Sequence, residues 1–212
     1  MFFAVKEFVH VAKPQLNRES IVATAIQMAD GHGLDAVSLR GIAKQLGVHV
    51  TSLYNYFPTK EAVLEEMMQA LLAEAELPQG KTTWQDWVKG FALAIRALAR
   101  KHPGAFQLFQ RNSAQGEQAL ESIESAVGAF RAGGFDLVSI SCALRTTNLL
   151  VLGLVIDDLA RHRYGEDHTR MDDLPIERFP HINELRNVDD DVDPFPYLLN
   201  VLIEGLAANK RS

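Results

Sequence analysis

The chain is poor in cysteine. Cys142 is its only one, so no disulfide can form within the chain. This usage is typical of a reducing compartment, and we expect a cytoplasmic protein. Cys142 lies in an apolar helical pattern, which predicts an unreactive residue of the core. No apolar stretch reaches membrane-spanning length, and residues 1–13 do not read as a signal peptide, because they contain Glu7 and no small-residue cleavage site. We therefore expect no membrane partner.

Motifs of enzyme chemistry are missing as well. The sequence has no glycine-rich phosphate loop, no nucleophile elbow and no metal-ligand pair at a recognised spacing. Its seven histidines are scattered. Three of them, His102, His162 and His168, lie near acidic residues, but nothing else indicates a general base. We expect no enzyme activity, no cofactor and no bound metal.

Strand patterns and internal repeats are also absent from the 212 residues, of which 47% are hydrophobic and 23% charged. This balance is ordinary for a globular protein. Apolar residues recur at helical spacing instead, which predicts an all-α fold.

An excess of basic residues is lacking too, since the net charge is −6. The charge is unevenly divided, however. Residues 1–60 carry six Lys/Arg and four Asp/Glu, whereas the remainder carries fifteen and twenty-three. The first segment is therefore weakly positive, and phosphate attraction alone would bind nucleic acid weakly.

The most informative stretch is residues 38–60, SLRGIAKQLGVHVTSLYNYFPTK. Ser38 is a good helix N-cap, and Gly47 suits the left-handed residue that ends a helix. After a tight turn, Thr51 and Ser52 open a second short helix, which Pro58 ends. Two short helices joined by a glycine-containing turn are the pattern of a helix-turn-helix.

This stretch closely resembles the DNA-binding domain of the TetR family of bacterial transcriptional regulators. The likeness runs from about Arg18 to Met67 and is carried by Arg40-Gly41-Ile42-Ala43, Leu46-Gly47-Val48, Leu53-Tyr54, Tyr56-Phe57-Pro58 and Lys60-Glu61. It implies a sequence-specific regulator that binds double-stranded DNA. The positions that it assigns to DNA contact are Arg40, His49, Val50, Thr51, Ser52, Tyr54, Tyr56 and Lys60.

The rest of the chain reads as further helices. After an extension over 1–16, Asn17 caps a supporting helix, and the helix-turn-helix domain occupies 17–62. A larger helical domain for ligand binding and dimerisation fills 63–212. Its predicted helices cover 59–77, 83–102, 105–112, 115–132, 136–162 and 194–210, with an acidic, proline-broken loop over 161–193.

Two of these helices are unusually apolar. The helix from Asp136 is almost continuously apolar over 140–156, which predicts burial on all sides. The last helix carries more apolar surface than its own domain can cover, which indicates an interface. Together they predict a four-helix bundle across a two-fold axis, and hence a homodimer. The resemblance implies the same arrangement.

A small-molecule effector is the partner that the resemblance implies for the larger domain. Such pockets are mostly apolar with a few polar groups. Arg145 and Asn148 interrupt the apolar run, and they can bond each other, the second subunit or a ligand. Apolar candidates for the same site, each of which can instead be plain core, are Phe91, Ile95, Phe106, Phe109, Phe130 and Leu152.

From Trp84 onward the chain also resembles the tetracycline repressors, in Trp84-Gln85-Asp86, in Gly153-x-x-x-Asp157-Asp158 and in the final helix. Their magnesium–drug chelate is held at places that correspond to Glu76, Phe91, Leu108 and Asp157. We expect a more apolar effector here. The function expected is therefore a repressor that binds a palindromic operator as a homodimer and is released by that effector. The alternative is a helical ligand-binding dimer without DNA-binding activity.

Overall fold

The computed structural model describes residues 16–111, 117–164, 175, 177–185 and 193–210. Every regular element in these residues is a helix, which confirms the all-α prediction. The α-helices are α1 (Arg18–His32), α2 (Leu39–Leu46), α3 (Val50–Tyr54), α4 (Lys60–Glu74), α5 (Trp84–Lys101), α6 (Leu108–Arg111), α7 (Glu117–Ala132), α8 (Leu137–Tyr164), α10 (Pro180–Leu185) and α11 (Phe195–Ala208). Short 3-10 helices, Leu34–Ala36 and Ala105–Gln107, precede α2 and α6. The predicted extension, apart from Leu16, lies outside the described residues.

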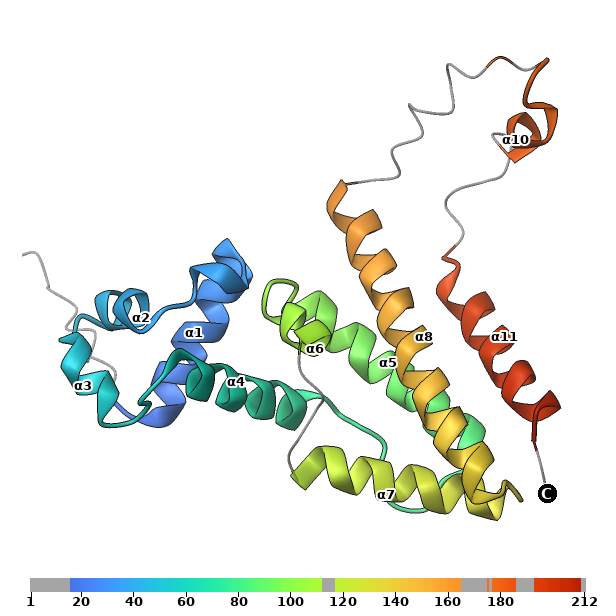
Figure 1. The fold of residues 1–212 in the computed structure, drawn as a ribbon, viewed down its shortest axis with the longest axis horizontal. Coiled ribbons are helices and arrows are strands. Elements are labelled where there is room, and N and C mark those ends of the chain that lie inside the picture. The colour runs from blue at the N-terminus through green and yellow to red at the C-terminus, as the bar shows by residue number, and fades with distance from the viewer. Residues whose placement is uncertain (1–15, 112–116, 165–174, 176, 186–192, 211–212) are drawn as a thin grey trace, which may run out of the picture.

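Helices α1 to α4 form the N-terminal lobe (Figure 1). The Asn17 side chain accepts a hydrogen bond from the Ser20 amide at 2.7 Å, and Ser38 and Thr59 cap α2 and α4 in the same way. These caps confirm the predicted helix starts. The fully buried side chains of this lobe include Ile21, Leu34, Ile42, Leu53, Phe57 and Met67.

Helix α4 is shared between the two lobes. It packs against α1 and also against α6 and α7. The hydrophobic core that contains Ile21 and Phe57 continues to Leu98 of α5 and Leu108 of α6. Packed side chains therefore connect the two lobes through one continuous core. The boundary predicted between residues 62 and 63 falls inside this shared helix.

Helix α5 organises the C-terminal lobe, where it packs against α7, α8 and α11 (Figure 1). Trp84 at its start stacks on Phe130 with ring centroids 5.5 Å apart and meets Phe135 edge-on at 5.3 Å. Aromatic pairs in these geometries add stability beyond the area that they bury. This cluster fixes the first turn of α5 against the end of α7.

Helix α8 corrects the prediction of burial on all sides. One stripe, which includes Ile140, Thr147 and Val155, is buried, whereas Leu149 and Leu150 are exposed. One chain supplies neighbours for only one face of so apolar a helix. The apolar side chains on the other face of α8 therefore remain exposed in the single chain.

Two other predictions about this helix were wrong. Its segment Leu137–Arg161 is long and apolar enough to cross a membrane by length and composition, although only 28% of its most apolar window is buried. One stripe of this helix packs against α5, α7 and α11. Cys142 is exposed rather than buried, because it lies on the open side of α8.

Candidate nucleic-acid interface and effector domain

Helices α2 and α3 have the geometry of a helix-turn-helix. Helix α2 ends at Gly47, whose left-handed backbone (φ 68°, ψ 32°) glycine adopts without strain. His49 then caps α3, with its Nδ1 atom 2.8 Å from the Thr51 hydroxyl. Helix α3 therefore begins at Val50, one residue before the predicted start. The buried Leu53 anchors it to the core.

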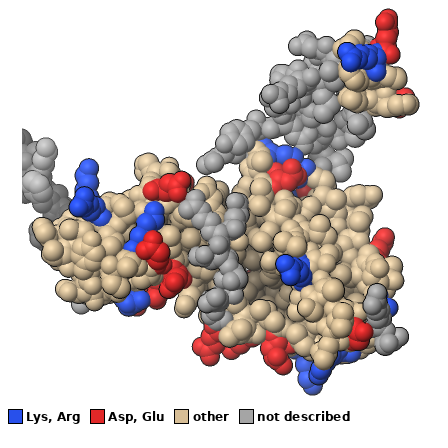
Figure 2. Space-filling view, in the orientation of Figure 1, with Lys and Arg blue, Asp and Glu red and all other residues tan. Residues whose placement is uncertain are grey.

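Four of the predicted DNA contacts are exposed: Arg40, His49, Thr51 and Tyr54. Tyr54 leaves 52% of its surface in solvent. Figure 2 shows lysine and arginine side chains standing apart on this lobe rather than forming one continuous patch. The arrangement suits contacts at individual bases and phosphates more than general attraction to a polyanion.

The other four predicted contacts, Val50, Ser52, Tyr56 and Lys60, are partly buried. Val50 packs against the N-terminal core, and Ser52 is half-buried. The Tyr56 hydroxyl donates a hydrogen bond to the Leu16 carbonyl oxygen at 2.9 Å. This bond gives the Tyr56 hydroxyl a role within the protein, which counts against its use in DNA contact.

An arginine that the sequence did not reveal supports the same region. Arg18 donates to the Tyr56 carbonyl oxygen at 2.8 Å, pairs with Glu66 at 2.7 Å and lies 4.3 Å from the centre of the Phe57 ring. It joins the start of α1 to the end of the α3 segment and to α4. No spacing along the chain predicts contacts between residues so far apart.

Lys60 occupies the first turn of α4, directly after the cap Thr59. A cation there opposes the positive end of the helix dipole. A phosphate group at this position would gain both the ammonium group and the helix amides as partners.

The predicted effector residues fall into two sets. Six of the eight lie in, or pack against, a second hydrophobic core formed by the C-terminal lobe: Phe91, Ile95, Phe106, Phe109, Phe130 and Leu152. Within this set, Phe106 stacks on Phe109 at 5.0 Å, and Phe91 stacks on Trp87 at 5.2 Å. The structure thus brings the apolar candidates together.

Arg145 and Asn148 do not join them, because both are exposed. The prediction that they contribute to an interior site is therefore corrected. Successive helical residues are rotated by about 100°, so the polar run 145–148 cannot all face inward. Its inward member is Thr147, which is 0% exposed and has a hydroxyl without a hydrogen-bond partner among the described residues.

Comparison with known proteins identifies the family of this chain. Residues 21–67 match the family described as bacterial regulatory proteins of the tetR family, and residues 77–210 match the tetracyclin repressor-like C-terminal domain. The chain belongs to the TetR family. It is a DNA-binding transcriptional regulator of that family.

Curated relatives of this TetR-family protein are named as regulators. An HTH-type transcriptional regulator of Saccharopolyspora erythraea is 30% identical over 74% of this chain and 67% of its own length. The repressor DrrR1 of Streptomyces coeruleorubidus is 28% identical over 79% of this chain and 61% of its own length. The tetracycline repressor protein class D of Escherichia coli is 26% identical, with 90% of this chain and 89% of the repressor covered.

Solved structures share the fold. Apo ActR from Streptomyces coelicolor superposes with a TM-score of 0.74 at 24% identity, covering 92% of this chain and 98% of ActR. ActR in complex with actinorhodin gives a TM-score of 0.76 at 23% identity, with the same coverage. The agreement extends over both lobes of the TetR-family chain.

A groove of about 540 Å³ lies between α8 and α11 of this TetR-family protein. Most of its wall is apolar, and it includes none of the eight predicted effector residues. Its lining comprises Phe135, Val138, Ser139, Cys142, Ala143, Thr146, Leu150, Leu154, Leu198, Val201, Leu202, Gly205, Leu206 and Asn209. This groove opens along the exposed stripe of α8.

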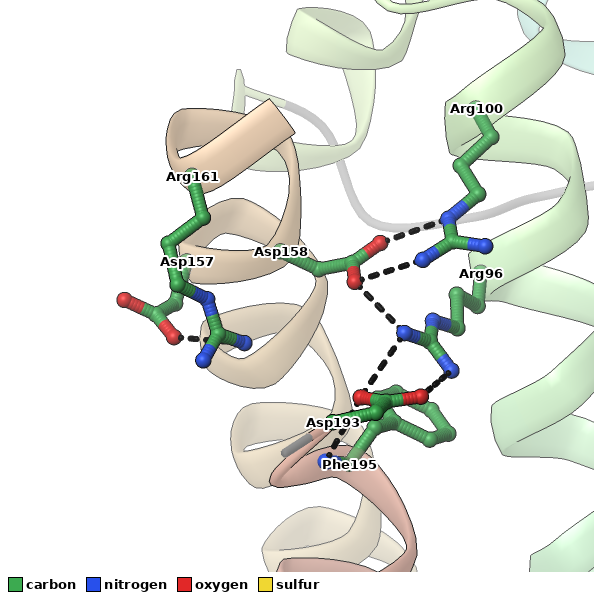
Figure 3. Close-up of polar contacts among 7 residues, drawn as sticks. All are labelled: Arg96, Arg100, Asp157, Asp158, Arg161, Asp193 and Phe195. Carbon is green, nitrogen blue, oxygen red and sulfur yellow. Dashed lines mark hydrogen bonds and ion pairs between the residues drawn. The ribbon is translucent and has the colours of Figure 1, made fainter. Parts of the chain in front are cut away.

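An ion cluster joins α5, α8 and the start of α11 (Figure 3). Asp158 accepts a hydrogen bond from Arg96 at 2.6 Å and two from Arg100 at 2.8 Å. Arg96 also donates to Asp193, and its guanidinium lies 4.3 Å from the centre of the Phe195 ring. Three segments are thus fixed at one point.

The electrostatics of this cluster keep Asp158 ionised. Burial alone would raise the pKa of Asp158, but the hydrogen bonds from Arg100 and Arg96 outweigh burial and hold the pKa well below its ordinary range. Its neighbour Asp157 is 61% exposed and pairs only with Arg161 among the contacts in Figure 3, at 3.2 Å. The two adjacent aspartates therefore have different roles. Asp158 is structural, and Asp157 faces solvent.

Proposed function

We propose that this protein is a homodimeric repressor that binds a palindromic operator and is released by a small, largely apolar effector. The observation that carries the proposal is the intact outer face of the helix-turn-helix. Arg40, His49, Thr51 and Tyr54 are exposed there, and the hydrophobic core does not require polar side chains at these positions. They have the donors and methyl groups that read base edges in the major groove.

The proposed roles divide by chemistry. Arg40 reads a base, since a bidentate arginine–guanine pair discriminates by about 1–3 kcal/mol. His49, Val50, Thr51 and Ser52 occupy the start of α3, where a recognition helix contacts base edges. Tyr54 and Lys60 hold phosphates and set the register of the protein on DNA.

The proposed dimer interface is the groove between α8 and α11 with its exposed neighbours. Leu150 and Val201 line the groove, and Leu149 and Tyr197 lie exposed on the same two helices. A second copy related by a two-fold axis would cover them with the same surface. The two recognition helices would then meet half-sites about one turn of DNA apart, or a multiple of that distance.

The proposed effector site is the apolar centre of the C-terminal lobe around Phe91, Phe106 and Phe130. The solved structure of ActR with actinorhodin supports an effector in a domain of this fold. The name of DrrR1 as a repressor supports repression. Because α4 shares one hydrophobic core with residues of α5 and α6, an effector that displaces these helices would change the positions of the two DNA-binding lobes.

The test is a selection of random duplex DNA by the purified protein at moderate salt. Enrichment of a palindrome supports the proposal and provides a probe for effector screening. An effector supports it further if it releases the protein from that probe. A folded dimer that enriches no sequence would contradict the proposal and leave a ligand-binding dimer without DNA-binding activity.

A further inference from the structure

The ends of α1, α4 and α5 meet at one histidine. His102 ends α5, and its Nδ1 atom lies 2.7 Å from Oδ2 of Asp30 in α1. Its Nε2 atom lies 3.2 Å from Oε1 of Glu74 in α4. The His102 side chain is 15% exposed, so water competes only weakly for these contacts. One side chain thus joins three helices from both lobes.

The backbone after His102 is held to α1 at the same point. The second oxygen of Asp30 accepts hydrogen bonds from the amides of Gly104 at 3.1 Å and Ala105 at 3.0 Å. Gly104 lies so close to α1 that a Cβ atom there would be 1.9 Å from the Ala29 carbonyl oxygen. The contact between the lobes is therefore tight as well as polar.

The chemistry of His102 makes this joint dependent on its proton. A carboxylate only accepts hydrogen bonds, so both ring nitrogens must carry hydrogen to satisfy Asp30 and Glu74 together. Only the imidazolium ion does so. A neutral ring has a single N–H, and its bare nitrogen would face a carboxylate lone pair.

The charged groups around His102 favour that ion. Asp30 faces it from α1 and Glu74 from α4, while Lys101 of α5 pairs with Glu74 at 2.6 Å. The hydrogen bond from Lys101 lowers the pKa of Glu74 despite partial burial, so Glu74 remains an acceptor. Asp30 and Glu74 carry two negative charges and Lys101 one positive charge. A protonated His102 would bring the net charge of the group to zero.

We propose that His102, between Asp30 and Glu74, is a proton-sensitive latch that fixes α1 and α4 to the end of α5. With the proton bound, the DNA-binding lobe is held in one orientation. When the proton leaves, one of the two arms is lost and the lobe gains freedom. A dimer with mobile lobes must order them to occupy two half-sites, which weakens binding. The consequence for the operator rests on the proposed function, whereas the latch itself does not.

The test compares the wild type with His102→Gln between about pH 6 and pH 8, where an ordinary histidine loses its proton. His181→Gln is the matched control, because His181 is 93% exposed. The latch favours the protonated ring, so its contribution to stability is present at low pH and lost as the pH rises. The thermal midpoint of the wild type should exceed that of His102→Gln at low pH and approach it at high pH. His181→Gln should follow the wild type.

Glu74→Gln provides a second variant, and it decides the matter should His102→Gln fail to fold. A glutamine amide can donate to the bare nitrogen of neutral His102, so both arms survive loss of the proton. Its stability should therefore depend less on pH than that of the wild type. At constant salt, operator affinity of the wild type should fall about fivefold or more over the same range, a typical coupling, and that of Glu74→Gln should change less.

Parallel loss of stability with pH in the wild type and in both variants would overturn the latch. The thermal measurements need no DNA, so they decide the latch even where no operator is found. Failure of the duplex selection would then count against the proposed function alone.

Discussion

Gly104 lies against the carbonyl oxygen of Ala29, where a Cβ atom would be 1.9 Å from that oxygen. The two residues belong to different lobes, and the obstructing atom is backbone, which cannot rotate away. A side chain at this position must therefore separate the 102–106 segment from α1.

Gly104→Ala should consequently lower the free energy of unfolding by about 1–3 kcal/mol, the usual range for an overpacked site. Gly128→Ala is the control, since Gly128 lies in α7 with no heavy atom within 4 Å of the added carbon. That change should stabilise the helix by about 0.5–1 kcal/mol. Urea unfolding of both variants measures the difference, and equal effects would contradict the close contact.

Asp158→Asn should destabilise the protein by on the order of 3 kcal/mol, because it leaves Arg96 and Arg100 without their buried carboxylate. The lowered pKa of Asp158 gives the pH dependence. Its stabilisation is present above the unfolded-state pKa of about 3.9 and is lost as the pH falls below that value. The difference in unfolding free energy between the wild type and Asp158→Asn should therefore shrink as the pH falls below that value.

Asp157→Asn is the matched control for this prediction, because it alters the adjacent residue. Its exposed pair with Arg161 should contribute less than about 1 kcal/mol. Denaturant unfolding at neutral and acid pH measures both variants. A similar loss for the two aspartates would refute the structural role of Asp158.

Arg40→Ala and Lys60→Ala should separate base reading from phosphate binding on the selected operator. Loss of Arg40 should remove base preference at one position in each half-site, at about 1–3 kcal/mol. Loss of Lys60 should weaken all sequences alike and reduce the salt dependence of binding by about one unit of slope. Affinity for single-position operator variants at several salt concentrations distinguishes the two. Uniform weakening by Arg40→Ala would assign Arg40 to phosphate instead.

The sequence predicted the features of this protein that depend on neighbouring residues. Ser38, Gly47 and Thr59 end or begin helices through bonds within a few residues, so their roles follow from local geometry. The hydrogen bond of Tyr56 was not predicted, because its partner, Leu16, lies 40 residues away. The Asp30–His102 pair spans 72 residues and was likewise invisible.

The errors on α8 have a related cause. The apolar composition of α8 suggested that all of its faces are buried. Composition does not say whether the residues that bury a face belong to the same chain or to another. Arg145 and Asn148 were expected at the effector site, but both are exposed, and the inward residue between them is Thr147. The side of a uniformly apolar helix that faces the core is set by the packing of α5, which no pattern in α8 records.

Leu150→Glu should convert the proposed dimer to a monomer, because it places a carboxylate in the groove between α8 and α11. Leu93→Glu is the control. Leu93 is exposed to a similar degree, 55% against 47%, but lies on α5 away from that groove. Sedimentation equilibrium measures the mass of each variant. A dimeric Leu150→Glu protein, or a monomeric Leu93→Glu protein, would place the interface elsewhere.

Thr147→Val should stabilise the protein by about 1 kcal/mol, since it replaces a buried hydroxyl that has no partner among the described residues with a methyl group of similar shape. Thr146→Val changes the adjacent threonine, which is exposed in the single chain but lines the groove proposed as the dimer interface. In the monomeric Leu150→Glu background it should alter stability by less than about 0.5 kcal/mol. Chemical unfolding of both variants without effector gives the comparison. This orphan hydroxyl is also a polar group that an effector in the C-terminal lobe can bond. Effector affinity should therefore fall in Thr147→Val while stability rises, and a rise in both would mean that the effector does not use this hydroxyl.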